Sequence, residues 1–251
     1  MLLVTFGAGT NSTGLLVGLH EKGIKPDIIL FADTGGEKPH TYAHIEEMQT
    51  WLKKAGFPPI ITVKKTDKNG EVLTLYDNLI DKKHLPAVAY GFKQCSQKYK
   101  IAPQDKYLNN LPEAKELWKS GGRITKYIGY DYDEPHRIKD HDCDKYKVEY
   151  PLYEWGWGRD ECIAAIKRAG LEQPRKSACY FCPNNRHSEI RELDRDYPDL
   201  MKKAIALEDN AETNTIVGLG RTFAWKNLIA TSDMFDNDHT PEAPCGCYDG
   251  D

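Results

Sequence analysis

The sequence LLVTFGAGTNSTG at residues 2–14 constrains the fold most, because an apolar run changes abruptly into small and hydroxylated residues. The run suits a buried parallel strand, and residues 15–22 suit a helix. The residues between them can bring the backbone close to a ligand or cap the helix: Gly7, Gly9, Asn11, Ser12 and Thr13. A helix start favours an anion such as pyrophosphate. We therefore expect either a phosphate-binding loop or an ordinary glycine-rich turn, and the spacing alone leaves both open.

Strand and helix patterns then alternate along the chain, which predicts an α/β fold. Further strands are expected at residues 27–31, 60–63, 124–129 and 148–153. Helices are expected at residues 39–55, 72–80, 112–122 and 162–169, followed by a helical, highly charged segment after residue 185. Because ligands of open α/β sheets bind at the carboxyl ends of strands, Asp33 and Thr34 are expected near the first loop. The alternative for Asp33 is a turn or capping residue.

Seven cysteines in one chain suggest metal or redox chemistry before structural disulfides. Cys179 and Cys182 form a CxxC motif followed by Pro183, which is compatible with a redox pair, a zinc site or an iron–sulfur cluster. Cys143 lies in a charged segment that has too few potential ligands to form a metal site by itself. It is expected to bind metal only if it joins a cluster built elsewhere.

Length and charge narrow the class of protein. The 251 residues suit one domain with an appendage, and the net charge of −4 is no sign of strong nucleic-acid binding, although a nucleic-acid substrate stays possible. No apolar run approaches the length of about 20 residues that a membrane span needs, and the N-terminus does not resemble a signal peptide. We expect a cytoplasmic protein without a membrane partner.

Five segments resemble, in the same order, the phosphoadenosine phosphosulfate reductase-like branch of the PP-loop ATP pyrophosphatase superfamily. The first is the loop of Thr5 to Thr13, in which Ala8 replaces a glycine and Asn11 stands where many relatives have Asp. The others are ADTGGEKPHTYAHI after the second strand, Cys95-Ser96 with Lys100 and Pro103, the segment with Gly129, Glu134 and Arg137, and the CxxC motif. Ser96 stands where the family has a second cysteine.

The resemblance implies an open, mainly parallel five-stranded, Rossmann-like sheet with helices on both faces. It implies ATP or another adenine nucleotide, with or without Mg²⁺, at the following residues: Thr5, Gly7, Gly9, Asn11, Ser12, Thr13, Asp33, Thr34, Gly129, Glu134 and Arg137. It also implies a [4Fe–4S] cluster on Cys95, Cys179 and Cys182, with zinc as the alternative. The fourth ligand is left to Cys143, a residue other than cysteine, or a substrate sulfur.

Three segments are expected along the chain: a nucleotide-binding domain at residues 1–185, a helical extension at 186–230, and a mobile tail at 231–251. The tail carries Cys245 and Cys247, a partial match to the reductases' terminal cysteine motif. One of these, with Asp33, is expected to act in catalysis.

Three functions remain open. The chain cleaves ATP to AMP and pyrophosphate to activate a substrate for sulfur transfer, or it is a sulfonucleotide reductase whose tail cysteine attacks the substrate sulfur. The third is a non-catalytic nucleotide- or cluster-binding protein. The partners expected are an adenine nucleotide, a sulfur donor or thiol reductant, and a second copy of the chain.

Overall fold

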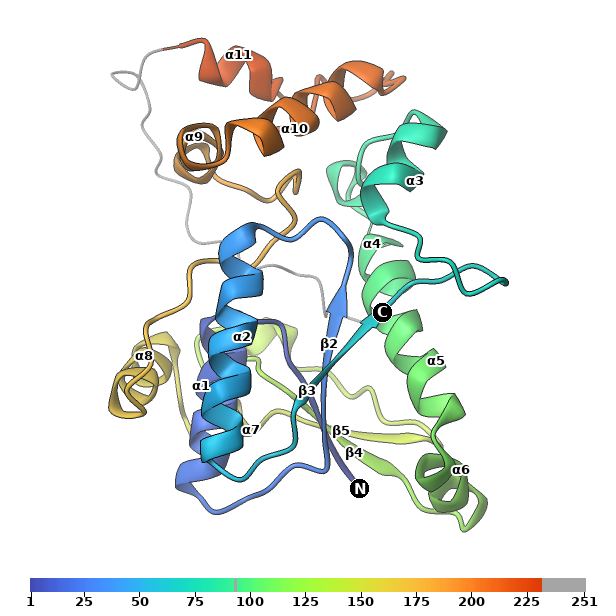
Figure 1. Cartoon of the computed structure of the whole chain (residues 1–251), viewed down its shortest axis with the longest axis vertical. Helices are drawn as coiled ribbons and strands as arrows, with labels where there is room; N and C mark the ends of the chain where they lie inside the picture. The colour runs from blue at the N-terminus through green and yellow to red at the C-terminus, as the bar shows by residue number, and fades with distance from the viewer. Residues whose placement is uncertain (93, 232–251) are drawn as a thin grey trace. The chain divides into compact units, whose positions relative to one another are not determined.

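The computed structural model describes residues 1–92 and 94–231 (Figure 1). The strands are β1 (Leu2–Thr5), β2 (Ile28–Asp33), β3 (Ile60–Lys64), β4 (Ile124–Ile128) and β5 (Tyr146–Glu149). The longer helices are α1 (Thr10–Glu21), α2 (Pro39–Lys54), α3 (Leu75–Lys82), α5 (Ala102–Asn110), α6 (Pro112–Lys119), α8 (Arg159–Arg168), α9 (His187–Asp196) and α10 (Pro198–Asn210). The shorter ones are η1 (Ala87–Tyr90), α4 (Gln94–Ser96), the π-helix η2 (Gln97–Ile101), η3 (Pro135–Arg137), α7 (Pro151–Glu154) and α11 (Trp225–Ile229).

The five strands form one sheet in the order β3-β2-β1-β4-β5, which confirms the predicted mainly parallel sheet. β1 pairs in parallel with both β2 and β4, and β4 pairs in parallel with β5. The order of the strands therefore reverses at β1, the central strand, and ligands of such sheets bind beyond the strand ends at this reversal point.

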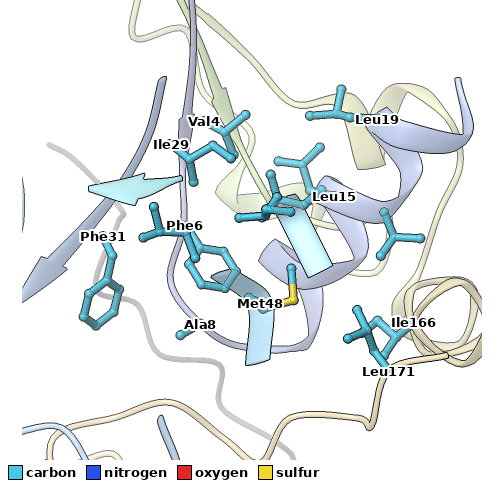
Figure 2. Close-up of a cluster of buried hydrophobic side chains, with 14 of the residues drawn as sticks. Val4, Phe6, Ala8, Leu15, Leu19, Ile29, Phe31, Met48, Ile166 and Leu171 are labelled. Carbon is cyan, nitrogen blue, oxygen red and sulfur yellow. The ribbon is translucent and has the colours of Figure 1, made fainter. Parts of the chain in front are cut away.

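Helices cover both faces of the sheet. Side chains alternate along each buried strand, so apolar side chains project from both faces and each face needs a covering layer. Val4 and Ile29 belong to one cluster, with apolar side chains of α1, α2, α7 and α8, and Figure 2 shows these strand residues gathered with Leu15 and Met48. Leu3 belongs to the cluster on the opposite face, which includes side chains of α5 and α6.

Two predicted boundaries differ most from the structure. Helix α1 begins at Thr10 and not at residue 15, so the capping residues expected in the loop form its first turn. Gly14 is needed inside this helix because an added Cβ would lie 2.8 Å from the Cβ of Cys162 in α8. The expected strand 148–153 ends at Glu149, since Pro151 starts helix α7 with the fixed φ that suits a first helical residue.

The chain forms two compact units that interleave in sequence. The sheet unit comprises Met1–Ala32, Pro39–Val63 and Pro103–Ser177, and the helical unit comprises Asp33–Lys38, Lys64–Ala102 and, within the described residues, 178–231. The sequence predicted consecutive segments divided after residues 185 and 230, whereas each of these units combines segments that are far apart in the chain. A cluster of its own, which includes Tyr99, Phe181 and Trp225, lies inside the helical unit.

Across residues 1–92 and 94–231, no helix combines the length and the apolar character that crossing a membrane requires.

Candidate functional site

The loop between β1 and α1 is the first candidate site, and it lies at the carboxyl end of the central strand. Gly9 is the N-cap of α1 with an extended backbone, and Ala8 has a φ of 56°. This left-handed conformation favours glycine, so Ala8 stands with some strain where the PP-loop pattern has glycine. The first backbone N–H groups of α1 have no acceptor within the helix and can bind an anion.

Ser12 closes the loop from inside the first turn of the helix. Its hydroxyl accepts a hydrogen bond from Gly9 N–H at 3.2 Å and lies 3.1 Å from Gly9 O. Gly129, which follows β4, packs against this turn, because an added Cβ would lie 3.1 Å from Ser12 Cα. The loop and Gly129 are therefore brought together.

Asp131 is a neighbour of the loop that the sequence analysis missed. It accepts a hydrogen bond from Asn11 Nδ2 at 2.7 Å and is only 3% exposed. Burial, followed by the charges of Glu134 and Asp133, raises the Asp131 pKa to about 6. Its position two residues after Gly129, at the end of a strand adjacent to β1, was the available signal.

Two hydroxyls expected to bind nucleotide have partners inside the protein. Thr13 Oγ1 lies 2.9 Å from His44 Nε2, and Thr5 Oγ1 donates to Tyr127 O at 3.1 Å. His44 Nδ1 in turn lies 3.2 Å from Glu47, and burial lowers the His44 pKa despite this carboxylate. Both threonine hydroxyls hold secondary-structure elements together in this structure.

Glu134 and Arg137 form a buried ion pair next to the end of β4. Arg137 Nη1 donates to both carboxylate oxygens of Glu134 at 3.0 Å. The guanidinium also stacks 3.9 Å from the Tyr130 ring centre, and Tyr130 stacks on Tyr150. These contacts hold the segment after β4 in place, so a nucleotide would meet charges that already neutralise each other.

Asp33 is the last residue of β2 and Thr34 follows it, and both belong to the helical unit. Asp33 Oδ1 accepts the Gly35 N–H at 2.8 Å, and Oδ2 pairs with Lys64 at 3.1 Å. The geometry of Asp33 is thus that of the turn residue considered as the alternative. Thr34 Oγ1 lies 3.1 Å from Cys179 Sγ, which connects this corner to the cysteines.

The second candidate site is a cavity inside the helical unit. Cys95, Cys179 and Cys182 all line it, although Cys95 lies far from the others in sequence. Their neighbours in the wall include Thr34, Ser96, Lys100, Phe181 and Asn184. Burial raises the pKa of Cys95, and burial together with the charge of Glu37 raises that of Cys179. All three are free cysteines, and a metal ion would have to displace the protons of the buried thiols.

A buried ion pair borders this cavity. Lys100 Nζ lies 3.5 Å from Glu37 Oε1, and both side chains are less than 10% exposed. Glu37 forms an antiparallel backbone bridge with Cys179, so the segment that carries the carboxylate runs beside the segment that carries the thiol. Lys100 lies in the π-helix η2, a distortion often found at functional sites. The sequence analysis had placed Lys100 in a motif without assigning it a role.

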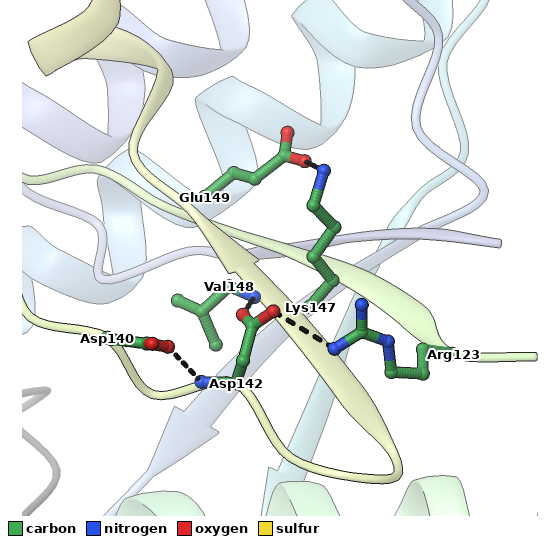
Figure 3. A network of polar contacts seen from close by, with 6 residues as sticks. All are labelled: Arg123, Asp140, Asp142, Lys147, Val148 and Glu149. Carbon is green, nitrogen blue, oxygen red and sulfur yellow. Dashed lines mark hydrogen bonds and ion pairs between the residues drawn. The ribbon is translucent and has the colours of Figure 1, made fainter.

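Cys143 is exposed and lies just before the amino end of β5, whereas the loop between β1 and α1 lies at the carboxyl end of β1. The Cys143 backbone pairs with Tyr146, the first residue of β5. Figure 3 shows the polar contacts that hold this segment, including the pair of Arg123 and Asp142 at 3.0 Å and the bond from Val148 N–H to Asp142 at 2.8 Å. Cys143 therefore lies in a well-held turn just before β5.

Within the described part of the chain, no three Cys, His, Asp or Glu side chains converge closely enough to coordinate one metal ion. Cys245 and Cys247, the expected nucleophiles, lie outside the described residues.

No model of a protein family matches the sequence, and no curated protein is significantly similar to it. Among solved structures, the chain is similar to the U34-tRNA thiolase NcsA from Methanococcus maripaludis with its [4Fe-4S] cluster. The identity is 14%, the TM-score is 0.46, and the match covers 92% of this chain and 80% of that chain.

Proposed function

We propose that this chain is a PP-loop enzyme that uses ATP to activate a substrate for sulfur transfer, with an iron–sulfur cluster held by Cys95, Cys179 and Cys182. The observation that carries the proposal is the cavity of the helical unit, whose wall contains all three cysteines. Cysteine thiolates are the usual ligands of iron–sulfur clusters, and nothing in the packing of an ordinary apolar core requires three free thiols around one cavity.

The phosphate loop supports the nucleotide half of the proposal. The start of α1 offers backbone N–H groups and a positive dipole end to the phosphates of ATP, and Ser12 holds the turn in shape. In the reaction, a substrate oxygen attacks the α-phosphorus of ATP and pyrophosphate leaves. A sulfur nucleophile then displaces AMP from the activated carbon, so the oxygen departs with AMP.

The donor set suits the proposed cluster, because soft thiolates prefer iron–sulfur clusters or zinc over hard cations. A bound cluster would supply a site that holds or delivers sulfur. The chain contributes the three thiols, and the charge of Lys100 favours the thiolate forms of Cys95 and Cys179 against the larger opposing effect of burial on their pKa values. The three side chains must turn toward one another to bind it, since they do not converge in this structure.

Iron analysis tests the cluster. Protein purified without oxygen is expected to contain iron and sulfide, and Cys179→Ser is expected to lose most of both. Cys162→Ser is the matched control, since Cys162 packs fully buried between α8 and α1, where burial raises its pKa to about 12. Stoichiometric zinc without iron in the wild-type protein, or iron retained in Cys179→Ser, would refute the proposed cluster.

Ligand binding tests the nucleotide half. ATP affinity, measured by calorimetry, is expected to fall in Ser12→Ala by roughly tenfold to a hundredfold, because a hydrogen bond that shapes a charged-ligand site is lost. Ser120→Ala, an exposed serine at the end of α6, is the control and should bind ATP as the wild type does. If adenosine phosphosulfate binds and ATP does not, the reductase function replaces this one.

A further inference from the structure

Ser177 lies against the phosphate loop, although it comes from a distant part of the chain. A Cβ added to Gly9 would lie 3.1 Å from Ser177 Oγ, and no other atom outside the loop approaches it within 4 Å. The hydroxyl therefore stands beside the N-cap of α1, in the space that a side chain at position 9 would occupy. The backbone of Gly9 is extended, a conformation that any residue can adopt. Glycine is therefore favoured here because a side chain would crowd Ser177, and not because of its backbone conformation.

The Ser177 hydroxyl differs from the other hydroxyls around the loop in its partners. Ser12, Thr5 and Thr13 each have a partner within the protein. Ser177 is partly exposed, and among residues 1–92 and 94–231 its side chain forms no hydrogen bond. An exposed hydroxyl without a protein partner at the start of a helix is available to a ligand that binds there.

We propose that Ser177 donates a hydrogen bond to a phosphate group held by the loop, as a ligand from outside the loop itself. This rests on the proposed binding of ATP at the start of α1. This donor comes from a segment outside the loop and outside α1. Hydrogen bonds from a neutral hydroxyl to a charged phosphate are stronger than those between neutral groups.

Ser177 lies close in sequence to one of the cysteines of the cavity. Cys179 lies two residues further on, and it is held by Thr34 Oγ1 at 3.1 Å and by the bridge to Glu37. A phosphate bound by Ser177 fixes one end of a two-residue segment whose other end carries a thiol of the cavity. Nucleotide binding is therefore expected to slow hydrogen exchange at the backbone amides of residues 177–180.

Calorimetry with inorganic pyrophosphate and with ATP tests the contact. Ser177→Ala is expected to lower both affinities about tenfold or more, while Ser120→Ala leaves them unchanged. The melting temperature of Ser177→Ala should match that of the wild type, since among the described residues the hydroxyl forms no hydrogen bond that would be lost. Equal affinities of wild type and Ser177→Ala would overturn the proposal, whereas failure of the wild type to bind either ligand would instead refute the proposed function.

Gly9→Ala provides an independent check, because its methyl group takes the space beside the Ser177 hydroxyl. We expect Gly9→Ala to weaken pyrophosphate binding in the wild-type background and to have a smaller effect in Ser177→Ala. Fully additive losses would contradict a shared contact. In hydrogen-exchange mass spectrometry, ATP should protect residues 177–180 of the wild type but not of Ser177→Ala, and equal protection in both would contradict the link to Cys179.

Discussion

At the scale of single residues, Asp131 combines burial with a direct contact to the phosphate loop. Its carboxylate accepts the Asn11 amide at 2.7 Å, and its pKa rises to about 6 from an ordinary value of 3.8, first through burial. The unfolded chain thus loses this proton at a lower pH than the folded chain does. Protonated Asp131 stabilises the fold fully below pH 3.8, and this contribution is lost as the pH rises through about 6.

Asp131→Asn is therefore expected to remove the part of the pH dependence of the unfolding free energy that comes from Asp131. The wild type should lose stability relative to this variant between about pH 4 and pH 6, by up to about 3 kcal/mol, since one pKa unit corresponds to about 1.4 kcal/mol. Urea unfolding at a series of pH values measures the difference. Asp142→Asn serves as the control with the opposite sign, because a backbone hydrogen bond from Val148 lowers the Asp142 pKa. A constant difference between wild type and Asp131→Asn would contradict the raised pKa.

At the scale of elements, the end of helix α10 organises the connection to α11 through one carboxylate. Glu208 is 7% exposed, and its Oε2 accepts the backbone N–H groups of Leu219 at 2.8 Å and Trp225 at 2.9 Å. The connection between the two helices has little regular structure of its own. Its buried N–H groups therefore depend on this side chain.

Glu208→Ala is expected to lower the free energy of unfolding by roughly 2–4 kcal/mol, because it leaves two buried N–H groups without an acceptor. Urea unfolding followed by circular dichroism gives the change. Glu212→Ala is a matched control on the same connection, where the Glu212 pair with Lys83 is exposed and contributes little. Similar stability of the two variants would show that Glu208 does not hold this connection.

At the scale of the whole molecule, the two proposed activities fall into different units. The phosphate loop belongs to the sheet unit, and the cysteine cavity belongs to the helical unit. The chain passes from one unit to the other between Ala32 and Asp33 and again between Ser177 and Ala178. Each of these passages lies within two residues of a group that borders the cavity, Thr34 or Cys179. At these two passages, the chain that carries the loop continues directly into the chain that borders the cavity.

The sequence alone was sufficient for much of the fold. Apolar runs interrupted by glycine and capping residues predicted all five strands and the loop after β1, because buried parallel strands and helix starts have strong local signals. The largest boundary errors were at residues 10 and 151. Pro151 as a first helical residue is a local signal that the expected strand overlooked, whereas the fit of Gly14 in α1 against Cys162 is a tertiary contact, which no local pattern contains.

The residues of the candidate site also divide into those that the sequence singled out and those that only the tertiary structure showed. The order of motifs predicted that the loop, Gly129 and the three cysteines belong to binding sites. These roles, like those of Cys143 and the tail cysteines, stay predictions. Only the tertiary structure showed that Thr13 bonds to His44 and Glu134 to Arg137, and that Asp131 and Ser177 reach the loop. Residue type determines which chemistry a side chain can perform. Whether it faces a ligand or a protein partner depends on packing between segments far apart in the chain, and local sequence carries little information about that packing.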